Sequence, residues 1–277
     1  MRMHEDVGTN VKRCIDLIHR AADQGAQIIS TPELFSSLYF CQKEDAAYFD
    51  LAESIPGPTT DALSKVAKER GITLVGSLFE KRAPGLFHNT AVVIDENGAL
   101  VGKYRKMHIP DDPNYYEKFY FTPGDLGFRA FPTKHAKVGT LVCWDQWFPE
   151  GARLTAMRGA EVLFYPTAIG AGAHESAGIP EKQRQAWITI QRAHAIANGV
   201  FVSVANRVGK EGDMRFWGSS FICGPLGEVL AQASDDKEEA LVATLDLADI
   251  DVVRQGWPFF RDRRIDAYAD LSQRFLD

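Results

Sequence analysis

The first part of the chain alternates between segments with a helical period of apolar residues and short apolar runs. From Val7 to Gly25, apolar side chains recur on one face of a helix that closes at a glycine. The apolar run Ala26 to Thr31 is typical of a short buried strand, and it ends at Pro32-Glu33. A second helix from Thr60 to Arg70 and a strand from Ile72 to Phe79 follow. We therefore predict a sheet covered by helices.

Two further strands are predicted next, from Asn89 to Asp95 and from Leu100 to Arg105, and the Asn-Gly pair between them is a strong hairpin signal. The second strand runs directly into Lys106. The segment from Asp111 to Gly127 is rich in aromatic residues, proline and glycine, and it contains Glu117. It is too long for a simple connection, so we predict that it forms a wall of an active site.

In the second half, an apolar strand starting at Lys137 stops at Cys143, and a helix from Pro149 to Gly159 follows. The remaining predicted elements are a strand from Val162 to Tyr165, a loop from Ile169 to Ile179, a helix from Glu181 to Ala197, and strands Phe201–Asn206, Phe216–Cys223, Val229–Ala231 and Ala240–Leu245. This order predicts an α/β fold in which a mixed sheet is layered with helices.

Composition and charge narrow the possible functions. With 277 residues, 45% of them hydrophobic, the chain is long enough for one large domain, which we expect to span residues 1–277. Lys and Arg total 31 against 37 Asp and Glu, with the signs mixed along the chain, so nucleic acid is not an expected partner. No apolar run approaches the roughly 20 residues that span a bilayer, and no signal-peptide pattern opens the sequence. We expect a cytoplasmic protein without a membrane partner.

The chain has four cysteines, Cys14, Cys41, Cys143 and Cys223. They form no C-x-x-C pair, which argues against a disulfide framework or a structural metal site. Cys143 stands apart because it lies between a strand and a helix, where α/β folds present nucleophiles. Glu33 and Lys106 also follow predicted strands, and ligands bind at the carboxyl ends of strands in such sheets. A thiol nucleophile needs a base, and its tetrahedral intermediate needs a cation or N–H groups. Taken alone, Cys143 is as well explained as an ordinary buried cysteine, Glu33 as a capping or solvated residue and Lys106 as a surface lysine. Together, the three residues indicate a thiol hydrolase.

Several segments resemble the successive motifs of the nitrilase superfamily of carbon-nitrogen hydrolases. They are Thr31–Phe35 (TPELF), Tyr104–Pro110 (YRKMHIP), Glu117–Asp125 (EKFYFTPGD), Val142–Asp145 (VCWD), Tyr165–Gly170 (YPTAIG) and Gln191–Asn198 (QRAHAIAN). The resemblance covers nearly the whole chain. Within the superfamily, the segments Tyr39–Gln42, Glu117–Gly124 and Cys143–Pro149 are most similar to the subfamily that hydrolyses N-carbamoylputrescine.

The resemblance implies a four-layer αββα sandwich, a reaction without metal or cofactor, a small-molecule substrate and a homo-oligomer built from dimers. It also implies a role for each motif residue. Glu33 is the expected general base and Lys106 the expected oxyanion stabiliser, while Cys143 is the expected nucleophile. Glu117 matches the second glutamate of the family, which holds the lysine and helps to place the substrate. The backbone N–H of Trp144 is the expected second oxyanion donor. His108 is expected to hold the lysine turn by a hydrogen bond rather than to take part in the chemistry.

The implied reaction converts N-carbamoylputrescine to putrescine, carbon dioxide and ammonia through a thioester on Cys143. Candidate residues for contact with the substrate are Tyr39, Asp111, Trp144, Thr167 and Ala168, with Asp112 and Glu175 as further carboxylates for a cationic tail. An opposite charge in a desolvated site favours such a tail.

Two alternatives stay open. A member that acts like a β-ureidopropionase or an ω-amidase needs a cation in the distal pocket, for which Arg153 and Arg184 are candidates, although both lie on predicted helices. A catalytically silent binding protein on this fold is expected to have lost one of the three catalytic positions, and all three are present. The chain also departs from the superfamily: it passes from Met1-Arg2-Met3 almost directly into a helix, so the usual apolar first strand is expected to be missing from the sheet.

Overall fold

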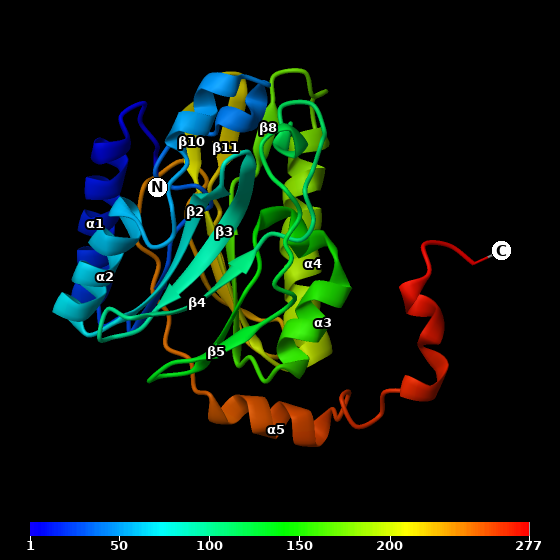
Figure 1. The fold of residues 1–277 in the computed structure, drawn as a ribbon. Helices are drawn as coiled ribbons and strands as arrows, with labels where there is room; N and C mark the ends of the chain where they lie inside the picture. The colour runs from blue at the N-terminus through cyan, green and yellow to red at the C-terminus, as the bar shows by residue number, and fades with distance from the viewer. Residues whose placement is uncertain (277) are drawn as a thin grey trace.

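The computed structural model describes residues 1–276 and arranges them in stacked layers of helices and strands (Figure 1). The helices are α1 (Val7–Asp23), α2 (Pro58–Arg70), α3 (Pro149–Met157), α4 (Ile179–Asn198) and α5 (Ala248–Gly256). The strands are β1 (Ile28–Ser30), β2 (Thr73–Ala83), β3 (Leu86–Ile94), β4 (Leu100–Arg105), β5 (Ala130–Pro132), β6 (Lys137–Thr140), β7 (Val162–Thr167), β8 (Gly170–Gly172), β9 (Phe201–Asn206), β10 (Val208–Glu211), β11 (Met214–Trp217), β12 (Phe221–Cys223) and β13 (Val229–Gln232). None of the helices in this range combines the length and apolar character needed to cross a bilayer.

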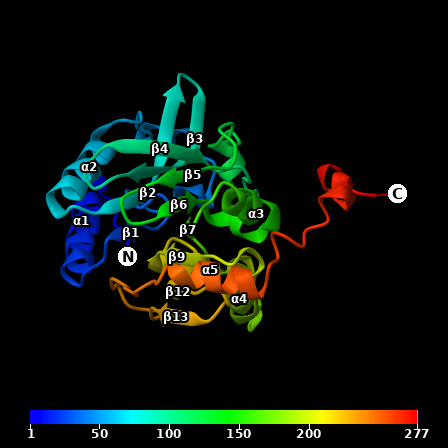
Figure 2. The same cartoon turned by 90° about the horizontal axis from the view of Figure 1, so that it is seen from below.

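Two sheets form the middle of the molecule. One has the strand order β1-β2-β3-β4, and the other has the order β13-β12-β9-β7-β6-β5. Seen from below, α1 and α2 lie outside the first sheet, whereas α3 and α4 lie outside the second (Figure 2). This arrangement is the predicted αββα sandwich. A small third sheet, β10-β11-β8, lies at the end of the molecule where the loops after the strands gather.

Apolar side chains fill the space between the two central sheets. Val75 of β2 and Val93 of β3 belong to one buried cluster with Val162 and Phe164 of β7 and Phe201 of β9. Separate clusters join α1 and α2 to the first sheet and α3 and α4 to the second. β2 is buried without interruption from Thr73 to Glu80 and β7 along its whole length, as expected of strands that are covered on both faces.

Local chemistry sets the ends of several elements. The side chain of Asp6 accepts the Thr9 N–H at 2.7 Å and so caps the first turn of α1. Pro58 opens α2, and Gly71 ends it in a left-handed conformation. The hairpin between β3 and β4 turns at Gly98, whose φ of +79° suits glycine. The predicted hairpin and both helices are therefore confirmed.

The strand directions bring the site loops to one end of the sandwich. β1 pairs in parallel with β2, and two antiparallel pairings relate β2 to β4, so β1, β2 and β4 run the same way. β6, β7 and β9 are likewise parallel to one another. The N–H of Glu33, after β1, donates to the carbonyl of Thr167 at the end of β7 over 3.3 Å. The carboxyl ends of the two sheets therefore meet.

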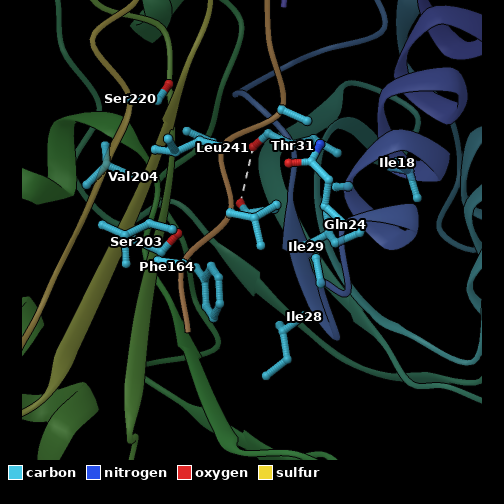
Figure 3. A pocket seen from close by; sticks show the side chains of 18 of the residues that line it. Ile18, Gln24, Ile28, Ile29, Thr31, Phe164, Ser203, Val204, Ser220 and Leu241 are labelled. Atoms are coloured by element: carbon cyan, nitrogen blue, oxygen red, sulfur yellow. Dashed lines mark hydrogen bonds between the residues drawn. The ribbon is translucent and has the colours of Figure 1, made fainter. Parts of the chain in front are cut away.

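No strand precedes α1 in the described part of the chain, so β1 is an edge strand that is paired only with β2. Residues 240–245, which the sequence predicted to be a strand, form none. A cavity of about 340 Å³ separates this segment from β1, and Figure 3 shows Leu241 between Val204 of β9 and Thr31. The prediction of a strand at 240–245 was wrong because an apolar run becomes a strand only where another strand lies beside it.

A second predicted strand, Phe216 to Cys223, is in fact two. β11 ends at Trp217 and β12 begins at Phe221. Between them Gly218 and Ser219 both have positive φ, +52° and +54°, which breaks the extended backbone. The loop predicted after β7 also contains a strand of its own, β8, which pairs with β11.

Candidate active site

Three charged side chains meet at the centre of the site. The Nζ of Lys106 donates to Oε1 of Glu33 at 2.8 Å and to Oε2 of Glu117 at 2.6 Å. All three side chains are fully buried. A lysine between two carboxylates in a closed site is held as an ammonium at a fixed position.

Each of these side chains comes from a different part of the sequence. Glu33 follows β1, Lys106 directly follows β4, and Glu117 opens a short 3-10 helix, η3 (Glu117–Phe119), in the long loop. Asn89 of β3 connects two of them, because its Nδ2 donates to Oε1 of Glu33 at 2.7 Å and its carbonyl accepts the Lys106 N–H at 2.9 Å. The sequence predicted the three charged residues but missed Asn89, whose only signal was its place at the start of a predicted strand.

Burial and charge together set the protonation of this cluster. Desolvation alone would lower the pKa of Lys106, but the charges of Glu117 and Glu33 raise it well above its usual value. Burial raises the pKa of Glu117, and Lys106 opposes that rise. Both hydrogen bonds to Glu33 go to Oε1, while its buried Oε2 has no hydrogen-bond partner among residues 1–276. Glu33 therefore has one free carboxylate oxygen that can accept a proton.

Cys143 begins the short 3-10 helix η4 (Cys143–Trp147) with a φ of +41°, a strained value for a residue other than glycine. β6 ends at Thr140, so the predicted strand stops three residues before the cysteine. The Sγ is nearly buried and lies 3.7 Å from the carbonyl oxygen of Ala168. Burial raises the pKa of the Cys143 thiol, and the charge of Glu33 raises it further. The thiol is therefore protonated at rest and needs a base to become a nucleophile.

Asp145 links the turn that contains Cys143 to the segment after β4. Its Oδ2 accepts the Val142 N–H at 3.0 Å and the phenol of Tyr104 at 2.8 Å. Its Oδ1 lies 2.7 Å from Nδ1 of His108 and accepts the His108 N–H at 3.0 Å. The expected structural role of His108 is consistent with these contacts. The sequence predicted no role for Asp145, because two of its partners, Tyr104 and His108, lie about 40 residues away along the chain.

The residues predicted to contact the substrate lie at different depths. Tyr39 is buried and donates from its phenol to Oε1 of Glu117 at 2.7 Å. Thr167 and Ala168 are buried at the end of β7, and Trp144 is half-buried beside Cys143. Asp111, in contrast, is exposed on the loop after β4. Tyr39 and Thr167 therefore contact the two glutamates of the charged cluster, Ala168 contacts the Cys143 thiol, and Asp111 lies nearer to solvent.

Glu175 is the carboxylate on the opposite loop. Its Oε1 accepts the Gly172 N–H at 3.0 Å, while its Oε2 is buried and lacks a partner in the described range. Burial raises the pKa of the phenol of Tyr115, and the charge of Glu175 raises it further. The same phenol donates to the carbonyl of Gly170 at 3.1 Å, so Tyr115 lies beside the strand β8 that precedes Glu175. Groups of three or more His, Cys, Asp or Glu side chains placed to hold a metal are not found in residues 1–276.

Comparison with known proteins defines the class of this fold and site. Residues 1–255 match the model of the carbon-nitrogen hydrolase family, and the chain belongs to this family. The superfamily that the motifs predicted is thereby confirmed.

Particular relatives are similar over nearly their full length. The chain is 46% identical to the N-carbamoylputrescine amidase of Solanum lycopersicum over 276 residues, which cover 96% of this chain and 91% of that protein. It is 40% identical to the citrullinase of Francisella tularensis, with 99% and 96% covered. The crystal structure of a carbon-nitrogen hydrolase from Helicobacter pylori G27 superposes with a TM-score of 0.96 at 46% identity, with 99% and 97% covered.

Proposed function

We propose that this chain is a thiol amidohydrolase that converts N-carbamoylputrescine to putrescine, carbon dioxide and ammonia. The observation that carries the proposal is the buried Lys106 between Glu33 and Glu117, with one oxygen of Glu33 left without a partner and with the charge of Glu33 acting on the buried Cys143 thiol. The similarity to N-carbamoylputrescine amidases supports the choice of substrate. The citrullinase relative also cleaves, by its name, a molecule with a carbamoyl group, so the ureido carbon is the common reacting centre.

The first half of the reaction forms a thioester. Oε2 of Glu33 takes the thiol proton as Sγ of Cys143 attacks the ureido carbon. The Lys106 ammonium and the backbone N–H of Trp144 stabilise the oxyanion of the tetrahedral intermediate. The proton on Glu33 then passes to the leaving nitrogen, the C–N bond breaks, and ammonia departs. A carbamoyl thioester remains on Cys143.

The second half regenerates the thiol. Glu33, again a carboxylate, takes a proton from a water molecule that attacks the thioester carbon, and the same donors stabilise the second intermediate. The C–S bond breaks, Cys143 recovers its proton from Glu33, and a carbamic acid leaves. The carbamic acid then breaks down to carbon dioxide and the amine. Glu117 keeps Lys106 charged throughout because it stays in contact with the ammonium.

Glu175 is our candidate for holding the distal ammonium of the substrate. Its unpartnered Oε2 is buried, and a buried carboxylate oxygen without a partner is costly unless a donor fills the position. Of the two arginines considered for the alternative substrates, Arg184 pairs with Glu181 at 2.6 Å, and Arg153 lies over Phe260 with its Nη1 buried and without a partner in the described range. Among residues 1–276, neither arginine forms an ion pair with Glu33 or Glu117, which both pair with Lys106.

The test is a panel of carbamoyl amines, carbamoyl amino acids, citrulline and ω-amides assayed by ammonia release. A charged hydrogen bond to the distal ammonium is worth about 1.5 to 3 kcal/mol, so kcat/KM for N-carbamoylputrescine should exceed that for N-carbamoyl-β-alanine by about 10- to 100-fold. Glu175→Gln should narrow the gap, whereas Glu181→Gln, which removes a more exposed carboxylate on α4, should not. A preference for a carboxylate-bearing substrate would refute the polyamine assignment.

We also propose that the protein is a homo-oligomer built from dimers. Residues 265–276 project from the body of the molecule (Figure 1) and carry exposed apolar side chains. These side chains are Ile265, Tyr268, Leu271, Phe275 and Leu276. Isolated apolar side chains are common on surfaces, but a projecting arm of them favours a protein partner. Light scattering at micromolar concentration tests this, and a monomer would refute it.

A further inference from the structure

Arg207, between β9 and β10, is a fully buried cation that reaches into the loop carrying Glu33. Its Nη2 donates to the carbonyl oxygens of Glu33 at 2.7 Å and Leu34 at 3.1 Å. Its Nη1 donates to the carbonyl of Ser37 at 3.3 Å. One guanidinium from the second sheet therefore binds three backbone carbonyls that follow the first strand of the other sheet.

Glu211, at the end of β10, completes the arrangement. It pairs with Nη1 of Arg207 at 2.9 Å, and its Oε2 accepts the backbone N–H of Tyr39 at 2.7 Å. The guanidinium also lies over the aromatic rings of Tyr39 and Phe216, 5.6 and 5.3 Å from their centroids. Arg207 and Glu211 therefore bind the backbone of the loop 33–39 at both of its ends.

This loop needs external support. Leu34 has a φ of +47°, a left-handed value that typically costs about 1 to 3 kcal/mol in a residue other than glycine. The preceding strand β1 is only three residues long and has one hydrogen-bonded neighbour. Strands of both sheets bind the N–H groups of this loop, because Glu33 donates to Thr167 and Leu34 donates to Ser77. Arg207 adds the contacts to the carbonyls of the same two residues.

We propose that Arg207 and Glu211 are positioning residues for the hydrolysis. Arg207 sets the place of the Glu33 carboxylate through its backbone. Glu211 sets the place of Tyr39, whose phenol in turn holds Glu117 against Lys106. One buried ion pair thereby aligns both carboxylates that flank the lysine. The inference rests on the proposed function, in which Glu33 is the base.

A purely structural role makes different predictions. Replacing either partner of a buried ion pair destabilises a protein because it leaves an uncompensated charge. A structural pair would therefore change the melting temperature and leave the kinetics of the folded fraction intact. A positioning pair changes kcat more than KM and alters the pH profile, because a displacement of about 1 Å in a catalytic group can cost about 100-fold in rate.

The experiment compares Arg207→Lys and Glu211→Gln with wild type. Lysine keeps the charge but cannot reach three carbonyls at once, so we expect kcat to fall about 10- to 100-fold, with KM changed less than about threefold. Glutamine keeps an acceptor for the Tyr39 N–H and loses the charge, so a smaller fall is expected. In both variants the acid limb of kcat/KM moves to higher pH, because a displaced Tyr39 phenol no longer lowers the pKa of Glu117.

A double-mutant cycle isolates the route through Tyr39. On the acid limb of the pH profile, Tyr39→Phe should cost clearly less in the Arg207→Lys background than in wild type, since the phenol is already misplaced there. Arg254→Lys is the matched control: this half-buried arginine donates to the carbonyl of Asn198 at the end of α4 and should leave kcat and the pH profile unchanged.

The outcomes separate the two proposals. A wild type that releases no ammonia from any substrate of the panel refutes the proposed function. An active wild type whose Arg207→Lys variant keeps its kcat and pH profile, with only a lower melting temperature, refutes the positioning role. If Arg207→Lys does not fold, the Glu211→Gln variant tests the positioning role. A Glu211→Gln enzyme with the kcat and the acid limb of wild type overturns the inference.

Discussion

The phenol of Tyr39 donates a 2.7 Å hydrogen bond to Oε1 of Glu117, while Oε2 of the same carboxylate accepts from Lys106 at 2.6 Å. Burial raises the pKa of Glu117, and both hydrogen bonds oppose that rise. The lysine is therefore held by a carboxylate that a neighbouring phenol helps to keep ionised. The hydrogen bond from Tyr39 therefore affects the pH at which Glu117 loses its charge and no longer pairs with Lys106 as a carboxylate.

We predict that Tyr39→Phe moves the acid limb of the kcat/KM profile to higher pH. The lost hydrogen bond favoured the ionised carboxylate, so its removal raises the pKa of Glu117. Activity at high pH should stay close to that of wild type. Tyr120→Phe is the matched control, because the Tyr120 phenol bonds backbone groups of Lys43 and Asp45 rather than a carboxylate of the charged cluster. A Tyr39→Phe profile that coincides with wild type would contradict this role of the phenol.

Cys143→Ala should abolish ammonia release and leave the fold intact. The thiol is the only nucleophile in the proposed scheme, and the strained turn at Cys143 is held by Asp145 rather than by the sulfur. Turnover and circular dichroism are measured together. The control is Cys223→Ala, which removes a buried thiol from β12 and should cost about 1 kcal/mol of stability with kcat unchanged. If Cys143→Ala keeps activity within about tenfold of wild type, Cys143 is not the nucleophile, and Cys41 becomes the candidate. Cys41 is also buried, and burial followed by the charges of Glu117 and Glu33 raises the pKa of its thiol.

Lys106→Arg should fail nearly as badly as Lys106→Ala. The lysine is fully buried between Glu33 and Glu117, so a larger planar guanidinium does not fit the same position. The loss of one oxyanion donor lowers kcat by about 10²- to 10³-fold. Lys103→Arg, on the strand β4 that precedes Lys106, keeps its partly exposed pairing with Glu80 and should change kcat little. A Lys106→Arg enzyme with most of its activity would mean that only the charge is needed.

Glu80 is predicted to make the protein sensitive to acid. Burial alone would raise the pKa of Glu80, but hydrogen bonds from Arg105, Lys103 and Thr90 lower it to about 2. A carboxylate with a depressed folded-state pKa stabilises the protein above its unfolded pKa and loses this contribution as pH falls through the folded value. Urea unfolding between pH 5 and pH 2 should show wild type losing about 3 kcal/mol more than Glu80→Gln. Parallel pH curves for the two proteins would contradict the prediction.

The sequence identified the charged centre of the site because each residue shared one local signal. Glu33, Lys106 and Cys143 follow predicted strands, and the structure brings Glu33 and Lys106 into direct contact. The sequence did not identify Arg207, although this residue also follows a strand, β9. A lone arginine after a strand is most often exposed. The importance of Arg207 lies in contacts with residues about 170 positions away, which no local pattern contains.

The strand prediction at residues 240–245 failed for a related physical reason. Apolar composition reports that a segment lies against the core, and this segment does border the cavity beside β1. Hydrogen-bonded pairing is a property of two segments, and the neighbour required here is missing from the described chain. The sequence had indicated this gap through the absence of an apolar run before α1, but it did not show which later element would lose its pairing.

The edge position of β1 has a consequence for how activity and structure are lost. Segments with few hydrogen-bonded neighbours open in local fluctuations that cost less than global unfolding, and their amides exchange with solvent first. β1 has a single neighbour and is followed directly by the loop that carries Glu33. In increasing denaturant, ammonia release should therefore disappear before the far-ultraviolet circular dichroism signal does. The enzyme is expected to inactivate as a still folded molecule in which only the strand before its base has come loose.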